Sequence, residues 1–327
     1  MPALVDSTAP RPYRGRFAPS PTGLLHLGSA ATAVLCAAAA RAARGALVLR
    51  VEDLDRERVL PGAADEILDD LRWLGLAWDE GPDVGGPHAP YVQSARLPLY
   101  EAALARLEGA GHTYLCDCSR AEIARAASAP HEGDEGPRYP GTCRPHGMIA
   151  RAFRRPPAVR LAIPEGEAGR VAFEDGVLGP RVEHASDRQG DFVLRRADGV
   201  FAYQLAVVVD DLAMGITHVV RGADLEASTA RQVLLARLLG GVAPAFAHVP
   251  LVTGPEGARL AKRARGVSLR DQRAAGRDPR ELVRAVARAY GHDVGDAPDP
   301  IAVLAACLSL ARLRGRRVAS EALDGLL

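Results

Sequence analysis

Apolar and polar residues along the first fifty positions predict alternating strands and helices. Residues 14–18 are predicted to form a short strand, and the proline-rich turn 19–23 ends it. A helix is predicted from about residue 27 to Gly45, which is placed to end it in a left-handed conformation. Residues 46–51 are mainly apolar and are predicted to form a buried strand. Strand, turn, helix and strand in this order indicate a βαβ unit that begins a parallel, doubly wound sheet.

The middle of the chain changes character twice. Residues 65–74 and 97–107 have the amphipathic period of helices, and Gly75 and Gly109 are predicted to end them. Between residues 111 and 184 the pattern breaks into short pieces separated by glycine and proline, and three of the five cysteines lie there. This shift in composition predicts a small inserted domain.

Helices and strands alternate again after the insert. Strands are predicted at 192–196 and 216–220, helices at 203–213 and 225–239, and residues beyond about 270 look helical throughout. The α/β pattern on both sides of the insert predicts a Rossmann-type doubly wound sheet with a small inserted domain. The predicted division is a tail at 1–12, a catalytic α/β domain made of 13–110 and 185–271, an insert at 111–184 and a helical part at 272–327.

Composition narrows the class of protein. Hydrophobic residues make up 48% and charged residues 25%, as in ordinary globular proteins. The apolar run 30–40 is shorter than the roughly 18 residues that a membrane span needs, and no basic segment followed by an apolar run begins the chain. We therefore expect a cytoplasmic protein with no membrane partner.

A net charge of +1 means that any nucleic-acid partner must be bound by local clusters of arginine. Acidic residues are interleaved with these clusters, so a salt-bridged surface is the competing interpretation. One cluster comprises Arg151, Arg154, Arg155 and Arg160, and the other comprises Arg263, Arg265, Arg270, Arg273, Arg277, Arg280, Arg284 and Arg288.

The single lysine is the most informative oddity of the composition. Of the 41 basic residues, only Lys262 is a lysine. A lysine retained in a chain that otherwise uses arginine suggests a position where a compact ammonium is needed. Chance retention is the alternative.

The turn before the first helix offers groups that suit a triphosphate. His26, Gly28 and Ser29 surround the predicted helix N-terminus, where backbone N–H groups and the helix dipole favour anions. The chain has neither a dinucleotide-binding fingerprint nor a Walker loop. A histidine at a helix start can also have a purely structural role.

Cys116, Cys118 and Cys143 are close enough in sequence to suggest a metal site in a reducing compartment. On ligand chemistry alone, His131 or His146 would be the fourth ligand. Reduced thiols without a metal are the alternative.

Two motifs together identify a family resemblance. Residues 19–23 followed by His26-Leu27-Gly28 resemble the HIGH region of glutamyl- and glutaminyl-type class I aminoacyl-tRNA synthetases. Residues 259–263 resemble a degenerate KMSKS loop, with Lys262 at its second lysine. The resemblance covers roughly residues 14–271. Ser29 replaces the last histidine of HIGH and Arg259 the first lysine of KMSKS.

This resemblance implies an ATP-dependent enzyme that activates glutamate, with Mg²⁺ accompanying ATP. His26 and Lys262 would be catalytic, and ATP would be bound by His26, Gly28, Ser29 and Lys262. Within the family, the sequence is similar to glutamyl-queuosine tRNA(Asp) synthetases, which implies one structural Zn²⁺ ion. The implied zinc ligands are Cys116, Cys118, Tyr139 and Cys143, and the implied L-glutamate ligands are Arg16, Ser20, Glu52, Tyr203 and Arg221.

The acceptor is the remaining question. Residues 272–327 are too few for the anticodon-binding domains of full-length glutamyl or glutaminyl enzymes. The resemblance therefore implies transfer of glutamate to the queuosine base in the anticodon of tRNA(Asp). A truncated glutamyl-tRNA synthetase that charges a tRNA 3′ end and a non-catalytic tRNA-binding module are the alternatives.

Overall fold

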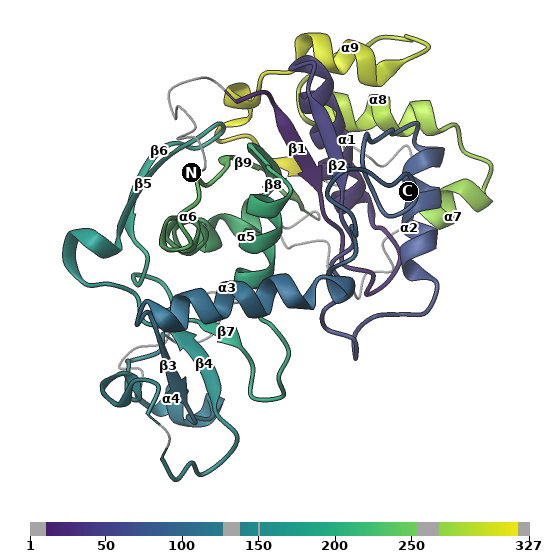
Figure 1. Cartoon of the computed structure of the whole chain (residues 1–327). Helices are drawn as coiled ribbons and strands as arrows, with labels where there is room; N and C mark the ends of the chain where they lie inside the picture. Colours follow the sequence, from purple (N-terminus) through teal and green to yellow (C-terminus); the bar gives the residue numbers. More distant parts are fainter. Residues whose placement is uncertain (1–10, 127–137, 150, 254–267, 320–327) are drawn as a thin grey trace.

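A computed structural model describes residues 11–126, 138–149, 151–253 and 268–319 (Figure 1). The strands of this part are β1 Arg14–Phe17, β2 Ala46–Leu49, β3 Thr113–Cys116, β4 Ala158–Leu161, β5 Arg170–Asp175, β6 Gly179–His184, β7 Val193–Arg195, β8 His218–Gly222, β9 Ala245–Val249, β10 Val252–Thr253 and β11 Val318–Ala319. The α-helices are α1 Leu27–Ala42, α2 Ala63–Trp73, α3 Leu97–Gly109, α4 Arg120–Ala126, α5 Tyr203–Ala213, α6 Thr229–Leu238, α7 Leu269–Ala274, α8 Pro279–Ala289 and α9 Pro300–Cys307.

The central sheet has six strands in the order β2-β1-β8-β9-β5-β6. All neighbouring pairs are parallel except the β5-β6 hairpin. The chain leaves β1 toward β2 on one side and later returns to β8 on the other. The strand order therefore reverses between β1 and β8, and such switch points are where open α/β sheets bind ligands. The predicted α/β fold class is confirmed.

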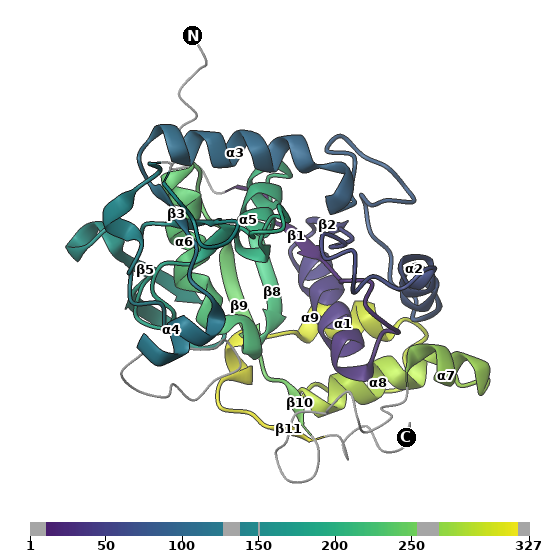
Figure 2. The ribbon, with the colours of Figure 1, turned by 90° about the horizontal axis from the view of Figure 1, so that it is seen from below.

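Helices cover both faces of this sheet. Helices α1, α8 and α9 lie together on one face, and α5 and α6 lie on the other with α3 beyond them (Figures 1 and 2). Each face has its own apolar core, and the α1 side includes the fully buried Leu35 while the α5 side includes Leu205 and Leu234. The apolar run 30–40 is the buried part of α1.

The segment 111–184 contributes to two different sheets. Strands β3 and β4 form a small antiparallel sheet together with β7, which comes after residue 184. Strands β5 and β6 instead extend the central sheet, with Asp175 of β5 opposite Phe246 of β9. The sequence boundary at residue 184 therefore does not coincide with a boundary between the two sheets, because β-pairing is a long-range choice that local composition does not encode.

Two predicted helix ends differ from the structure for identifiable reasons. Arg44, with φ of 50°, is the left-handed residue after α1. Gly45 is required instead by close packing, because a Cβ there would lie 2.2 Å from the Tyr13 carbonyl oxygen. Helix α3 continues through Gly109, and Gly111, with φ of 73°, ends it.

The end of the described chain is mostly helical, but not entirely. Helices α7, α8 and α9 are followed by β11, which pairs in parallel with β10. Within the described ranges, no helix has both the length and the hydropathy to cross a bilayer.

Candidate active site at the switch point of the sheet

Most of the predicted glutamate ligands come from elements that meet at the switch point. Arg16 lies in β1, Arg221 lies in the adjacent β8, and Glu52 follows β2. Tyr203 is the first residue of α5. Residues far apart in sequence are thus brought to neighbouring strands at the edge where parallel sheets bind ligands.

Arg16 is a buried cation with donors to spare. Only 6% of the residue is exposed, and its one ion pair with a described residue is between Nε and Asp211 Oδ1 at 3.5 Å. The buried Nε has no hydrogen-bond partner. Within the described chain no hydrogen bond from Nη1 or Nη2 is formed either. A buried guanidinium whose N–H groups are unsatisfied is costly unless a ligand satisfies them, and a carboxylate fits this role.

A buried arginine that the sequence analysis missed connects two sides of the site. Arg50 is fully buried, and it donates to Asp211 Oδ1 at 2.7 Å and to Glu52 Oε1 at 3.0 Å. Asp210 Oδ2 lies 3.6 Å from its Nε. Glu52, Arg50, Asp211 and Arg16 therefore form a continuous chain of charges. Its sequence signals are an arginine directly after an apolar strand and an acidic pair within the apolar helix α5.

Burial and neighbouring charges shift the pKa values of Glu52 and Asp211 in opposite directions. Burial raises the pKa of Glu52 above its usual value, although Arg50 and Arg16 oppose the rise. Burial also disfavours ionisation of Asp211, but Arg16 and Arg50 outweigh it and the pKa of Asp211 is lowered. Of these two carboxylates, Glu52 is the one whose pKa is raised.

Most N–H groups of the Arg221 guanidinium donate hydrogen bonds to other residues of the protein. Its Nε donates to His248 Nε2 at 2.9 Å and its Nη1 to Gln232 Oε1 at 2.7 Å. Its Nη2 donates to Thr229 Oγ1 at 2.8 Å and to the Leu225 carbonyl at 3.2 Å. Among the described residues, this leaves one N–H of Nη1 without an acceptor. Burial lowers the pKa of Arg221.

Two hydroxyl-bearing residues complete the predicted glutamate set. Tyr203 is 37% exposed, and Ser20 is exposed in the turn after β1. Neither side chain makes a hydrogen bond to another residue in the part of the chain that the structure describes. Both hydroxyls are therefore accessible to a ligand.

The start of α1 is open to solvent. His26 is the N-cap residue, but its side chain does not cap the helix, and both His26 and Ser29 are exposed. Among the described residues, a Cβ on Gly28 would have no heavy atom within 4 Å. Uncapped N–H groups beside open space suit the phosphates and base of a nucleotide.

The two predicted signature motifs are adjacent at one point. His26 forms an antiparallel bridge with Ser268, and the Leu269 N–H donates to the Leu25 carbonyl at 3.0 Å. Ser268 directly follows residues 254–267, which contain Arg259 and Lys262 and lie outside the described residues. The predicted roles of Lys262 therefore stay predictions.

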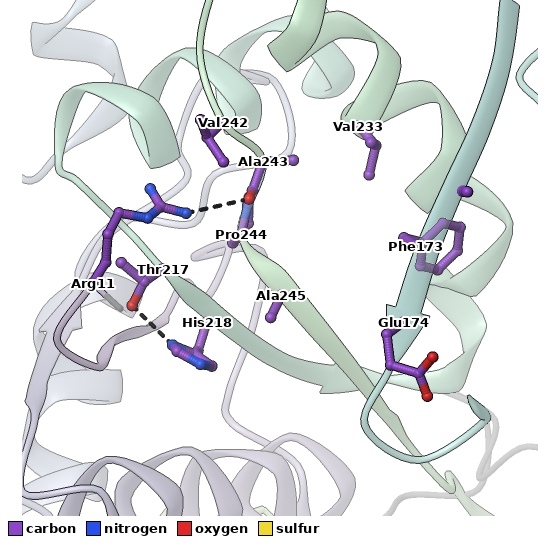
Figure 3. Close-up of a pocket in the computed structure, with 11 residues that line it drawn as sticks. Arg11, Phe173, Glu174, Thr217, His218, Val233, Val242, Ala243, Pro244 and Ala245 are labelled. Atoms are coloured by element: carbon purple, nitrogen blue, oxygen red, sulfur yellow. Dashed lines mark hydrogen bonds between the residues drawn. The ribbon is translucent and has the colours of Figure 1, made fainter. Parts of the chain in front are cut away.

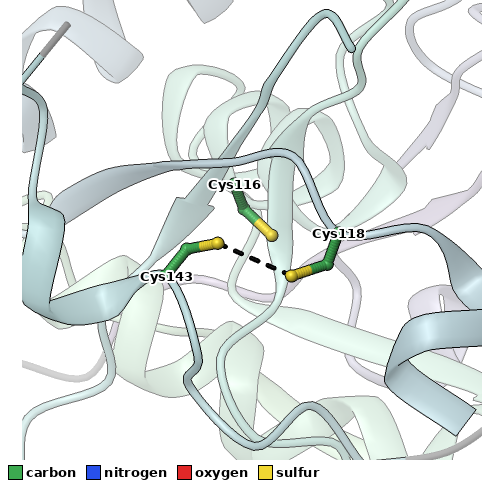
Figure 4. A group of neighbouring side chains, drawn as sticks. All are labelled: Cys116, Cys118 and Cys143. Atoms are coloured by element: carbon green, nitrogen blue, oxygen red, sulfur yellow. Dashed lines mark hydrogen bonds between the residues drawn. The ribbon is translucent and has the colours of Figure 1, made fainter. Parts of the chain in front are cut away.

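The three predicted cysteine ligands form a compact group (Figure 4). The sulfur atoms of Cys116, Cys118 and Cys143 lie within 4.8 Å of one another, with 3.5 Å between Cys118 and Cys143. The Tyr139 hydroxyl lies 3.3 Å from Cys116 Sγ and 3.9 Å from Cys118 Sγ. For tetrahedral zinc, ligand separations of about 3.5–3.8 Å are expected. The donor set therefore fits this metal.

Neither histidine alternative gains support. His146 is exposed and is not a member of the cysteine group, while His131 lies outside the described residues. Positive charge does approach the group, because the Arg160 guanidinium lies 3.9 Å from the Tyr139 ring centroid. Arg151 Nη2 is 3.5 Å from Cys143 Sγ. Burial disfavours ionisation of Cys116, but hydrogen bonds and Arg160 outweigh it and lower the pKa of this thiol, whereas burial raises the pKa of Cys118 to about 12.

Many arginines of the two predicted basic clusters are paired with acidic side chains. Arg151 and Arg154 pair with Asp117, and Arg155 pairs with Glu122. The partners in the second cluster are Glu66 for Arg270 and Arg273, Asp278 for Arg280 and Glu281 for Arg284. Arg263 and Arg265 lie outside the described residues. For these arginines, the interpretation as a salt-bridged surface therefore applies.

A cavity of about 600 Å³ lies elsewhere (Figure 3). Its lining includes His218 at the start of β8, Ala245 at the start of β9 and Phe173 of β5. These are the amino ends of β8 and β9, whereas Arg221 and the other predicted ligands lie toward the carboxyl ends. The cavity is therefore separate from the candidate active site.

Comparison with known proteins decides the family. Residues 13–298 match the family described as tRNA synthetases class I (E and Q), catalytic domain. The chain belongs to this family.

The relatives of this class I synthetase chain carry two kinds of name. A glutamyl-Q tRNA(Asp) synthetase of Symbiobacterium thermophilum is 54% identical over 292 residues, or 88% of each chain. A protein of the same name from Nitratidesulfovibrio vulgaris is 53% identical over 80% of this chain and 82% of its own. Glutamate–tRNA ligase 1 of Halorhodospira halophila is 44% identical, over 85% of this chain and 58% of that protein.

Solved structures agree with this family assignment. A glutamate tRNA ligase from Elizabethkingia meningosepticum, in complex with its amino acid, superposes with a TM-score of 0.78 at 28% identity. The match covers 97% of this chain and 69% of that one. The synthetase fold predicted from the two signature motifs is therefore confirmed.

Proposed function

We propose that this chain activates L-glutamate with ATP in the absence of tRNA and then transfers it to the queuosine base in the anticodon of tRNA(Asp). The relatives named glutamyl-Q tRNA(Asp) synthetase support this, since the match extends over 80% or more of both chains in the examples above. The structural observation that carries the proposal is Arg16, a buried guanidinium with unsatisfied donors at the switch point of the sheet.

Glutamate recognition follows from the charges of the site. The ligand carries two carboxylates and one ammonium, so it needs cations and an anion at fixed separations. Arg16 and the remaining N–H of Arg221 are the proposed carboxylate donors, and Glu52 accepts from the ammonium. The hydroxyls of Tyr203 and Ser20 provide further hydrogen bonds. Glutamine would place an uncharged amide against a buried arginine, which disfavours it.

Activation joins a carboxylate oxygen of glutamate to the α-phosphorus of ATP while the bond from that phosphorus to the bridging oxygen breaks. Pyrophosphate leaves and takes the electron pair of the broken bond. The proposed work of the protein is positioning and charge stabilisation. His26 and the N-terminus of α1 interact with the phosphates, Gly28 gives the base room, and Lys262 neutralises the leaving group. Mg²⁺ bound to ATP adds charge neutralisation.

The cysteine group is proposed to bind one structural Zn²⁺ through Cys116, Cys118, Tyr139 and Cys143. Four protein ligands leave no open position, which is typical of structural zinc and not of catalytic zinc. The site would tie β3 to the segment around Cys143. Its role would be to shape the small sheet as a docking surface for RNA.

The alternative acceptor is the 3′ end of a tRNA, as the glutamate–tRNA ligases among the relatives suggest. Two assays separate the possibilities. Pyrophosphate exchange with glutamate and no tRNA should proceed, and Arg16→Ala should suppress it by raising KM for glutamate. Labelled glutamate should then be transferred to queuosine-containing tRNA(Asp), but not to tRNA(Asp) that lacks queuosine.

Three results would oppose this proposal. Efficient charging of tRNA(Glu), or activation that requires tRNA, would favour a truncated synthetase. Absence of exchange under all conditions would favour a non-catalytic tRNA-binding module. Residence in the cytoplasm, where tRNA and ATP are both available, is part of the same proposal.

A further inference from the structure

Three buried polar residues, Asp175, His248 and Arg221, are joined by hydrogen bonds that end at Arg221 Nε. Asp175 Oδ2 lies 2.5 Å from His248 Nδ1, and His248 Nε2 lies 2.9 Å from Arg221 Nε. The three residues come from β5, β9 and β8, which are neighbours in the sheet. His248 is fully buried, and Asp175 and Arg221 are 2% and 3% exposed.

The hydrogen-bond chemistry fixes the protonation of this chain. The Nε–H of arginine is only a donor, so His248 Nε2 must present a lone pair to it. The proton of the neutral imidazole therefore sits on Nδ1, where it is donated to Asp175. Burial lowers the pKa of His248, although Asp175 opposes the fall, and this is consistent with a neutral ring.

Asp175 is itself held in one orientation. Its Oδ1 accepts from the backbone N–H groups of Val177 and Leu178 at 2.9 Å, and the N–H of His248 is 3.3 Å away. Oδ1 is thus committed to backbone donors, and Oδ2 is the atom that remains for the imidazole. The carboxylate cannot exchange its two oxygens without breaking these bonds.

We propose that Asp175 and His248 are positioning residues that lock Arg221 in the orientation in which its free N–H meets the glutamate ligand, and so set the affinity for glutamate. The inference rests on the proposed function. Neither residue is proposed to touch the substrate. In this relay, the bond at Nε adds to the restraint that Gln232, Thr229 and the Leu225 carbonyl place on Nη1 and Nη2. A more fully restrained guanidinium loses less freedom when the ligand binds.

The variant Asp175→Asn tests the relay with almost no change of shape. The backbone donors will keep the amide oxygen in the place of Oδ1, which puts the amide NH₂ against His248 Nδ1. The imidazole must then carry its proton on Nε2, so it can no longer accept from the Arg221 Nε–H, and the Thr229 hydroxyl oxygen, 3.2 Å away, is the acceptor that faces Nε2. We expect KM for glutamate in pyrophosphate exchange to rise about tenfold, with kcat and KM for ATP within about twofold.

A second variant and a control accompany this measurement. His248→Gln removes the ring and should also raise KM for glutamate. His218→Gln replaces a histidine at the opposite end of the same strand pair and should leave all three constants unchanged. In an Arg221→Lys background, which lacks Nε–H, Asp175→Asn should have no additional effect on KM. Additive effects, or a fall in kcat at unchanged KM, would overturn the relay.

One readout is independent of enzyme activity. Nitrogen-15 NMR of labelled histidine in the wild-type protein should show His248 as the Nδ1–H tautomer, reversed in Asp175→Asn. A wild-type Nε2–H tautomer would overturn the relay even if glutamate is the substrate. Conversely, the expected tautomer in a protein that does not activate glutamate would contradict the proposed function while leaving the hydrogen-bond chain established.

Discussion

His26 and Ser268 are paired as an antiparallel bridge, which places the residue before α1 against the residue before α7. Ser268 caps α7 in a reciprocal arrangement with Asp271. The N-terminus of α1 and the beginning of α7 are thereby fixed to each other. Because Lys262 precedes Ser268 by only six positions in the sequence, this pairing makes cooperation of Lys262 with His26 on one triphosphate a testable idea.

We predict that Lys262→Ala reduces pyrophosphate exchange by about 10²–10³, the usual cost of removing one stabilising contact to a developing charge. Lys262→Arg should also be impaired, because a planar guanidinium does not replace a compact ammonium. Circular dichroism should show an unchanged fold. Full exchange activity in the arginine variant would refute the argument from the single lysine.

Glutamate affinity should depend on pH through Glu52. The pKa of this carboxyl is raised by burial, and its ionised form binds the ligand ammonium more tightly than the protonated form because it forms an ion pair with it. The value of kcat/KM for glutamate should therefore fall as pH is lowered through a pKa higher than that of an exposed glutamate. In Glu52→Gln the value should be low and should lack this acid limb. Persistence of the limb in the variant would assign it to another group.

The buried carboxylate of Asp70 should lower the free energy of unfolding at neutral pH. Its side chain is buried, both its oxygens lack hydrogen bonds, and burial raises its pKa to about 6. The folded state therefore binds a proton more tightly than the unfolded state. The contribution of Asp70 to the free energy of unfolding is therefore most favourable at low pH, and it is lost as the pH rises from about 4 to about 6.

Asp70→Asn should accordingly raise Tm at pH 7.5 and flatten this part of the pH profile. Arg273, 3.6 Å from Asp70, keeps its closer partner Glu66 at 2.7 Å. The neighbouring exposed residue provides a matched control, since Asp69→Asn should leave Tm nearly unchanged. A lower Tm for the Asp70 variant would mean that its pairing with Arg273 outweighs the cost of burial.

The purified protein should contain one zinc ion per chain. Tyr139→Phe should weaken zinc binding, because it removes the hydroxyl 3.3 Å from Cys116 Sγ. Tyr114→Phe is the matched control, since the Tyr114 hydroxyl instead donates to Asp191. Elemental analysis and competition with a chelator measure both. Chelation should loosen the small sheet before glutamate activation declines, and equal zinc affinity in the two variants would exclude the tyrosine ligand.

Transfer to tRNA should depend more steeply on salt than activation does. Contacts between arginine and phosphate release counterions, so transfer should weaken as salt increases. Adenylation needs no RNA and should change little. Parallel titrations of pyrophosphate exchange and glutamate transfer with NaCl measure the difference. Equal salt dependence of both steps would argue against an arginine-rich RNA contact surface.

The sequence by itself determined the local features of this protein. The alternation of apolar runs predicted β1, α1 and β2 in order, and the helix predicted at 203–213 is α5 with the same bounds. The cysteine spacing predicted the three-sulfur group. These features depend on contacts between residues near one another in the chain or on motifs of fixed spacing, which a single sequence displays directly.

Only the tertiary structure decided how distant residues share charges. The linked residues Glu52-Arg50-Asp211-Arg16 and the relay from Asp175 through His248 to Arg221 join side chains that are up to 195 positions apart, as Arg16 and Asp211 are. Only the tertiary structure also decided the pairing of the β5-β6 hairpin. This hairpin lies within the predicted insert, residues 111–184, but its strand β5 pairs with β9 of the central sheet. Burial decides which of these polar groups must be partnered, and burial is set by how strands and helices pack, which local sequence patterns do not specify.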